Sequence, residues 1–167
     1  MPIRLAGLFP VFAGICGLLL SPPAIRADYQ VLHTFTYTTG GDTPLAAPTV
    51  VENVLYGTTS ADWTSGVGTV FSMNSDGSAF KLLHTFNNTD GAMPSGSLVL
   101  SGSALYGLTG GGGANNGGTV FRVNTDGTGF QLVHSFSPAS DGSDPRGSLL
   151  QVGNVFYGTT TYGGVYG

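Results

Sequence analysis

The residues best suited to bind a ligand lie in the loop between residues 60 and 67. This loop carries Trp63, the only tryptophan of the chain, beside Asp62. An exposed indole next to a carboxylate can hold a sugar, because the ring stacks on the sugar while the carboxylate accepts hydrogen bonds. Packing of Trp63 between β-sheets is the alternative. The corresponding Gly-rich loop further along carries Asn115 and Asn116. The sequence therefore predicts a ligand-binding site that draws on Asp62, Trp63, Asn115 and Asn116.

Three histidines, His33, His84 and His134, raise a metal or catalytic hypothesis. Each lies in a separate apolar run, on the same face of its expected strand as large apolar residues. A histidine on such a face is typically a core group that donates a hydrogen bond to a backbone carbonyl. We therefore expect the three imidazoles to be buried, equivalent and without a shared site.

No arrangement of side chains is typical of catalysis. Asp141 and Asp144 are close in sequence, but they share a turn before Pro145, whereas glycosidases need two carboxyl groups opposed across a cleft. The sequence lacks G-x-S-x-G and H-E-x-x-H. The Asn-x-Asp-Gly turns at residues 74–77 and 124–127 lack the later carboxylate of a calcium loop. We expect a protein that is not an enzyme and that holds no cofactor and no metal.

The elements that would position these residues are β-hairpins. Residues 68–86 read GTVFSMNSDGSAFKLLHTF, and residues 118–136 repeat the pattern as GTVFRVNTDGTGFQLVHSF. Each stretch holds two apolar runs around an Asp-Gly pair, a strong hairpin signal because Gly adopts positive φ without a Cβ clash. In the second run, Phe80, Leu82, His84 and Phe86 are expected on one face of the strand. A further copy of this run, at residues 29–36, is expected to be a strand as well.

The sequence repeats itself every 50 or 51 residues. Each repeat holds about four short strands, expected in the middle of the chain at residues 68–73, 80–86, 97–101 and 104–109. The fold class is therefore all-β, with tandem four-stranded repeats of kelch-like length that predict β-propeller blades. A β-solenoid or an open stack of hairpins is the alternative. The markers of the period are Tyr56, Tyr106 and Tyr157, then Pro44, Pro94 and Pro145, and the three histidines.

The strand types are not present in equal number. The His-Thr-Phe and Tyr-Gly-Thr types each occur about three times, and the Gly-Thr-Val-Phe type occurs twice. Three repeats are fewer than the usual four to eight blades of a closed propeller. An incomplete ring, truncated at its C-terminus, is therefore expected. Its open sheet edges would expose unpaired backbone groups and favour self-association.

Residues 1–27 have the layout of a signal peptide, with Arg4 ahead of an apolar run and a small residue before residue 28. A transmembrane anchor is the alternative, but the run is short for a bilayer span of about 20 residues. Cleavage would leave residues 28–167 as one β-repeat domain, secreted or at the cell surface. This domain carries three positive and nine negative residues, a formal net charge of −6. Such a charge disfavours nucleic acid and anionic membranes as partners.

The order of the motifs resembles a known family. A Leu-Tyr-Gly-Thr-Thr strand, a Gly-rich loop, a Gly-Thr-Val-Phe strand, an Asn-x-Asp-Gly turn and a Leu-Leu-His-Thr-Phe strand follow one another through nearly all of residues 29–167. This series is similar to the bacterial GloVer tandem-repeat family. The resemblance implies an exported repeat array, often held at the cell surface by a C-terminal anchor that varies among members. It implies no catalytic residues and no particular ligand.

Two functions are compatible with these observations. The first is a cell-surface or secreted binding scaffold, which displays variable loops on a rigid β-framework to a protein or glycan partner. The second is a carbohydrate-binding or carbohydrate-processing propeller. Exposure of Trp63 and the tyrosines together on one rim would favour the second function.

Overall fold

The computed structural model describes residues 30–36, 41–60 and 67–165. The chain divides into two compact units, Met1–Val31 and Leu32–Gly167, and nearly all described residues belong to the second. Of the first unit only Gln30 and Val31 are described, and they have no regular secondary structure. The predicted signal peptide lies outside the described residues. No helix in the described part of the chain is long and apolar enough to cross a membrane.

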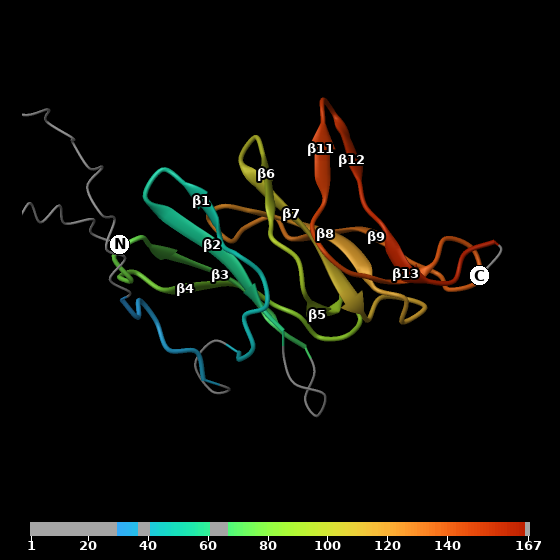
Figure 1. Cartoon of the computed structure of the whole chain (residues 1–167), viewed down its shortest axis with the longest axis horizontal. Coiled ribbons are helices and arrows are strands. Elements are labelled where there is room, and N and C mark those ends of the chain that lie inside the picture. Colours follow the sequence, from blue (N-terminus) through green and yellow to red (C-terminus); the bar gives the residue numbers. More distant parts are fainter. Residues whose placement is uncertain (1–29, 37–40, 61–66, 166–167) are drawn as a thin grey trace, which may run out of the picture. The chain divides into compact units, whose positions relative to one another are not determined.

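All regular secondary structure in these residues is β, which confirms the all-β prediction (Figure 1). The strands are β1 (Thr49–Val51), β2 (Val54–Thr59), β3 (Thr69–Asn74), β4 (Lys81–Thr85), β5 (Ala92–Pro94), β6 (Val99–Ser101), β7 (Ala104–Gly111), β8 (Thr119–Asn124), β9 (Gln131–Ser135), β10 (Ser143–Pro145), β11 (Leu150–Val152), β12 (Val155–Tyr157) and β13 (Thr160–Tyr162). The four strands predicted for the middle of the chain are present, with ends shifted by a few residues.

Every sheet is antiparallel, and the sheets follow the repeats. We call residues 41–86 the first repeat, 91–136 the second and 142–165 the third, each beginning at the glycine of a Gly-x-x-Pro segment. The first repeat forms a four-stranded meander, β1-β2-β3-β4. The second forms a five-stranded sheet in which β6, β7, β8 and β9 reproduce that meander and β5 pairs with the far part of β7. The third consists of two pairs, β11-β12 and β10-β13. None of these sheets closes on itself.

The Asn-x-Asp-Gly turns form the predicted hairpins. One carboxylate oxygen of Asp76 accepts hydrogen bonds from the backbone N–H and the hydroxyl of Ser78, at 2.9 and 2.6 Å. These bonds lower the pKa of Asp76. Gly77 follows with φ +86°, a conformation in which a Cβ would be strained. Asp126 and Thr128 repeat the arrangement in the second hairpin.

The predicted alternation along the second hairpin strand is wrong, because each copy contains a β-bulge. Val70 pairs with His84 but Phe71 pairs with Leu82, so β4 carries one extra residue, Leu83. A bulge reverses the facing of the residues on one side of it. Leu82 is consequently exposed and Leu83 is buried. The same shift occurs between β8 and β9 in the second repeat.

The core is built from the Phe of each Gly-Thr-Val-Phe strand and the Gly that pairs with it. Phe71 and Phe121 are buried, as predicted. The pairing partner of Phe121 on β7 is Gly107, and a Cβ on Gly107 would lie 2.5 Å from the ring. The missing side chain thus makes room for the Phe ring at the centre of the sheet.

Successive repeats pack through equivalent residues, which we call the seam. The ring of His84 stacks on Phe130 of the second repeat, with centroids 3.5 Å apart, while Phe86 meets Phe121 edge-on. His33 stacks in the same way on Phe80 of the first repeat, at 4.1 Å. However, residues 30–36 form no strand, contrary to the prediction for residues 29–36. A strand needs a pairing partner, and no described strand pairs with this segment.

Candidate functional site

The Gly-x-x-Pro segments form three equivalent corners in the backbone. The residue before each proline is not glycine, yet it has positive φ: +57° in Thr43, +56° in Met93 and +54° in Asp144. This conformation is strained for residues with a side chain, and a following proline disfavours it further. Strain of this kind persists only where the surrounding structure imposes it. The corner geometry is therefore a property of the repeat, whatever side chain it carries.

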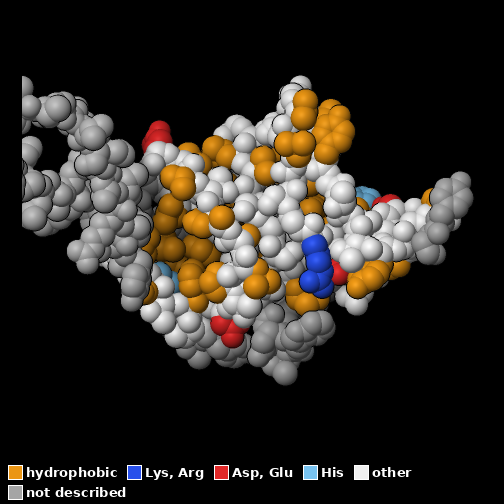
Figure 2. Space-filling model, in the orientation of Figure 1, with side chains coloured by type: hydrophobic (Ala, Val, Ile, Leu, Met, Phe, Trp, Pro, Cys, Tyr) orange, Lys and Arg blue, Asp and Glu red, His pale blue; other side chains and the backbone are white. Residues whose placement is uncertain are grey.

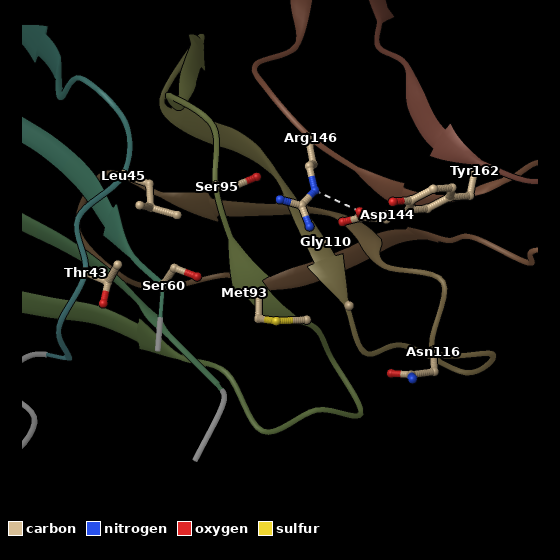
Figure 3. A pocket seen from close by; sticks show the side chains of 11 residues that line it. Thr43, Leu45, Ser60, Met93, Ser95, Gly110, Asn116, Asp144, Arg146 and Tyr162 are labelled. Atoms are coloured by element: carbon tan, nitrogen blue, oxygen red, sulfur yellow. Dashed lines mark hydrogen bonds and ion pairs between the residues drawn. The ribbon is translucent and has the colours of Figure 1, made fainter. Parts of the chain in front are cut away.

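The three corners meet at one hollow of about 540 Å³, which we call the corner hollow (Figure 3). Each repeat contributes the residue before its proline and the residue after it. The residues that line the corner hollow are Thr43, Leu45 and Ser60 from the first repeat, Met93, Ser95, Gly110, Gly111 and Asn116 from the second, and Asp144, Arg146 and Tyr162 from the third. Equivalent backbone positions thus present an apolar, a small polar or a charged side chain depending on the repeat.

One side of the corner hollow is charged. Nε of Arg146 donates a hydrogen bond to Oδ2 of Asp144 at 2.7 Å (Figure 3). This bond raises the pKa of Arg146, which stays positively charged. The guanidinium is largely exposed while the Asp144 carboxylate is half-buried, so the pair holds the cation at the surface of the hollow. The lining also includes the apolar side chains of Leu45 and Met93.

The structure brings one of the four predicted ligand-binding residues to this hollow. Asn116 lines it, although its Oδ1 also accepts a hydrogen bond from the N–H of Gly112 at 3.0 Å and so shapes the loop. Asn115 is exposed beside it. Asp62 and Trp63 lie outside the described residues, and their role stays a prediction. The sequence reasoning used the three prolines only as markers of the period. The sequence signal for this site was that the residues directly before and after each proline differ from repeat to repeat.

His33 and His84 take part in the seams, His134 does not, and the three histidines do not form a common site. Nε2 of His84 lies 3.0 Å from Oδ2 of Asp90, whose other oxygen accepts the N–H of Asn87. His134 and Asp141 form the same pair at 2.6 Å. The expected hydrogen bond from each histidine to a backbone carbonyl is therefore wrong for His84 and His134. In both cases the partner is a carboxylate that also caps the following turn. The expected burial of all three imidazoles is wrong: His33 and His84 are half-buried, and His134 is exposed because no described residue stacks on its outer face.

Acidification is expected to destabilise the fold through His84. Burial lowers the pKa of this imidazole, although the nearby Asp90 carboxylate acts in the opposite direction. The unfolded chain therefore takes up a proton at a higher pH than the folded chain. The stability contributed by neutral His84 is complete above about pH 6.5 and is lost as the pH falls through that value toward the folded pKa.

Urea titrations at about pH 7.5 and about pH 5.5 would measure this effect as a fall in the free energy of unfolding. The matched variant is His84→Phe, which keeps a ring against Phe130 but has no group that titrates. We expect a smaller fall in this variant than in the wild-type protein. Equal falls in the two proteins would contradict the role of His84.

The fold and the seam define a class of protein, an all-β tandem-repeat protein in which copies of one antiparallel meander pack through equivalent residues. The family model described as the Gloeobacter/Verrucomicrobia repeat matches residues 20–167. The chain belongs to this family, which confirms the resemblance to the GloVer repeats. No curated protein and no solved structure matches the chain.

Proposed function

We propose that this protein is an exported interaction scaffold that binds its partner at the corner hollow. The observation that carries the proposal is the construction of that hollow. Three equivalent, strained corners supply one fixed backbone frame, and the side chains on the frame differ from repeat to repeat. A constant frame with variable side chains is the arrangement by which rigid β-scaffolds present binding surfaces. The function has no catalytic step.

The repeats act in this proposal as propeller blades around a common axis. Two contacts between the segments that follow the corner prolines support it, because they join residues one repeat apart. The hydroxyl of Ser97 donates to the carbonyl of Ala47 at 2.8 Å, and the N–H of Ser97 donates to the hydroxyl of Ser148 at 2.9 Å. Segments of successive blades that approach one another in this way are typical of the centre of a propeller.

Export and location complete the proposal. The layout of residues 1–27 supports secretion through a signal peptide. The acidic balance of residues 28–167 supports a protein or glycan partner over nucleic acid. We place the protein outside the cytoplasm, either secreted or at the cell surface.

A carbohydrate ligand is the second candidate, favoured by the composition of one wall. Tyr162 lies in the corner hollow beside the Asp144–Arg146 ion pair. An aromatic ring next to charged hydrogen-bonding groups is a common way to bind a sugar. The same corner hollow would serve both candidates, so the ligand class has to be measured.

Two screens with the purified chain would test the function. A glycan array tests the carbohydrate candidate, and a phage-displayed peptide library tests a protein partner. The affinity of every binder is then measured for the variants Arg146→Ser and Leu45→Ser. Each substitution introduces serine, the residue that the second repeat carries at the equivalent position, Ser95. Gln131→Ser, exposed on β9 outside the hollow, is the control.

Selective binding that weakens about tenfold or more in a corner variant, a loss of about 1.4 kcal/mol, and not in the control would support the corner hollow. Binders whose affinity is the same for both corner variants and the wild type would show that the binding site lies elsewhere. Failure of both screens to yield a binder would contradict the interaction scaffold.

A further inference from the structure

The third corner differs from the other two in the side chain beside its strained peptide bond. All three corners join a residue of positive φ to a proline, and in the third these residues are Asp144 and Pro145. A carboxylate oxygen of Asp144 can close a five-membered ring on its own backbone carbonyl carbon. The hydroxyl of Thr43 could close only a four-membered ring, and the thioether of Met93 is no nucleophile for an amide. The Asp144–Pro145 bond therefore has a nucleophile built into it.

The backbone on both sides of this bond is held in place. The N–H of Asp144 donates to the carbonyl of Gly117 at 2.9 Å. Pro145 is fully buried, and a Cβ on Gly118 would lie 2.7 Å from its Cδ. Both contacts come from the second repeat, so the positive φ of Asp144 cannot relax while the bond is intact. Cleavage would release this strain, and part of its barrier is therefore already overcome in the folded chain.

The carbonyl group of the bond accepts a hydrogen bond that favours attack. The hydroxyl of Thr161 on β13 donates to the backbone oxygen of Asp144 at 2.7 Å. A donor at this oxygen stabilises the negative charge that develops there when the carbon is attacked. The equivalent residue in the second repeat is Gly110, which has no hydroxyl. In the first repeat the corner carbonyl accepts the N–H of Ser60, but that corner has no carboxylate.

The carboxylate of Asp144 has one fixed oxygen and one free oxygen (Figure 3). Oδ2 accepts the hydrogen bond from Nε of Arg146 at 2.7 Å, while no described donor reaches Oδ1. Oδ1 has room because a Cβ on Gly110 would lie only 2.8 Å from it. Arg146 and Thr161 are exposed, and Figure 2 shows basic atoms beside acidic atoms at the surface of this face. Oδ1 is thus available as a nucleophile, and solvent reaches the groups around it.

We propose that the chain cleaves its own Asp144–Pro145 peptide bond. Oδ1 attacks the backbone carbonyl carbon of Asp144, and an electron pair moves onto the carbonyl oxygen, where the Thr161 hydroxyl stabilises it. When the carbonyl re-forms, the bond to the nitrogen of Pro145 breaks. The electron pair of that bond stays on the nitrogen, which takes a proton from solvent. Asp144 is left as a cyclic anhydride, which one water molecule opens to two carboxyl groups, so the net reaction is hydrolysis of one peptide bond.

The proline also blocks a competing reaction. Its nitrogen carries no N–H, so it cannot attack the side chain of Asp144 to form a cyclic imide. The cut leaves a new carboxylate on Asp144 and a new amino group on Pro145, and it would therefore change the charges at the corner hollow. The reaction depends on its own contacts and not on any bound partner, so the inference goes beyond the proposed function.

The test is to incubate the purified chain at about pH 6 and to follow by mass spectrometry the fragments that end at Asp144 and begin at Pro145. The same chain unfolded in concentrated urea is the reference, because Asp-Pro bonds also break slowly without any structure. We expect the folded chain to cleave about tenfold faster or more, since only the folded chain holds the strain and the Thr161 contact. The rate constant should not change when the protein is diluted, as it would with a contaminating protease.

Two variants test the roles of the side chains. Asp144→Met gives the third corner the residue of the second, Met93, and should abolish the cut. Thr161→Val keeps a β-branched side chain without the hydroxyl and should slow the cut about tenfold or more. The control, Val50→Ser, changes an exposed residue of the first repeat and should cleave at the wild-type rate. Thermal melts establish that each variant folds. If Asp144→Met does not fold, the isosteric Asp144→Asn takes its place, with much slower cleavage expected.

Equal rates in the folded and the unfolded chain would overturn the proposal, because they would show only the ordinary lability of an Asp-Pro bond. So would a folded wild-type chain that yields no fragments. Cleavage at the same bond in a folded Asp144→Met protein would show that the carboxylate is not the nucleophile. An undiminished rate in Thr161→Val would overturn the role of its hydroxyl.

Discussion

Phe121→Ala is expected to lower the free energy of unfolding by about 3–5 kcal/mol, as truncations of large buried aromatic side chains do. The ring is fully buried and lies at the seam. It contacts Phe86 from the preceding repeat and Phe130 from its own. Gly107 beneath the ring has no side chain that could move into the space left behind. The substitution therefore removes apolar contacts from both repeats and leaves a cavity between them.

Denaturant unfolding followed by circular dichroism would measure this loss. Val133→Ala is the matched control, because it also truncates an apolar side chain of the second repeat but at an exposed position. We expect the control to change stability by less than about 0.5 kcal/mol, as surface substitutions usually do. Similar effects of the two substitutions would mean that the Phe121 face is not the core of the seam.

Gly118→Ala is expected to cost about 2–5 kcal/mol, the sum of backbone strain and overpacking. Gly118 has φ +94°, and a Cβ there would collide with the carbonyl oxygen of Thr109 and lie 2.7 Å from Cδ of Pro145. Thr109 belongs to the same sheet and Pro145 to the next repeat. Neither can retreat easily, because the first is backbone inside a buried strand and the second is a buried corner proline.

Gly147→Ala separates the two causes. Gly147 has nearly the same conformation, φ +96°, but a Cβ there would meet nothing within 4 Å. This substitution should cost only the strain, about 1–2 kcal/mol. The difference between the two variants in unfolding experiments then reports the collision at the seam. Equal losses would show that Gly118 is required for its conformation alone.

Much of the fold was predictable because its signals are local. An Asn-x-Asp-Gly turn specifies a hairpin through its own side chains and one glycine, and the structure shows that turn at Asp76 and Asp126. The fixed spacing of the repeats is visible without any contact between them. The burial of Phe71 and Phe121 follows from their place in the strands that recur with that spacing.

Which face of β4 carries the side chains of Leu82 and Leu83 was not predictable in this way. It depends on a bulge, and a bulge is defined by pairing between two strands. Strict alternation, which is all that the sequence displays, gives the opposite result. The His84–Asp90 pair has the same origin, because the chain must turn after Phe86 before the carboxylate can reach the ring.

The corner hollow was missed because its residues are about one repeat apart in sequence. Thr43, Met93 and Asp144 share no side-chain chemistry, so no motif connects them. What they share is the backbone conformation before a proline, and the usual preference at that position predicts an extended residue. The prolines mark three equivalent positions in the sequence, but that these positions meet at one hollow is visible only once the three corners are placed in space.

The equivalence of the seams affects how the gene for such an array can change. Removal of the codons for residues 69–118 would join Gly68 to Thr119 and restore the Gly-Thr-Val-Phe sequence in frame. Phe35, which now meets Phe71, would then meet Phe121 in an equivalent environment. Unequal crossing-over between repeats can thus lengthen or shorten the array while every new junction reuses a contact that already exists.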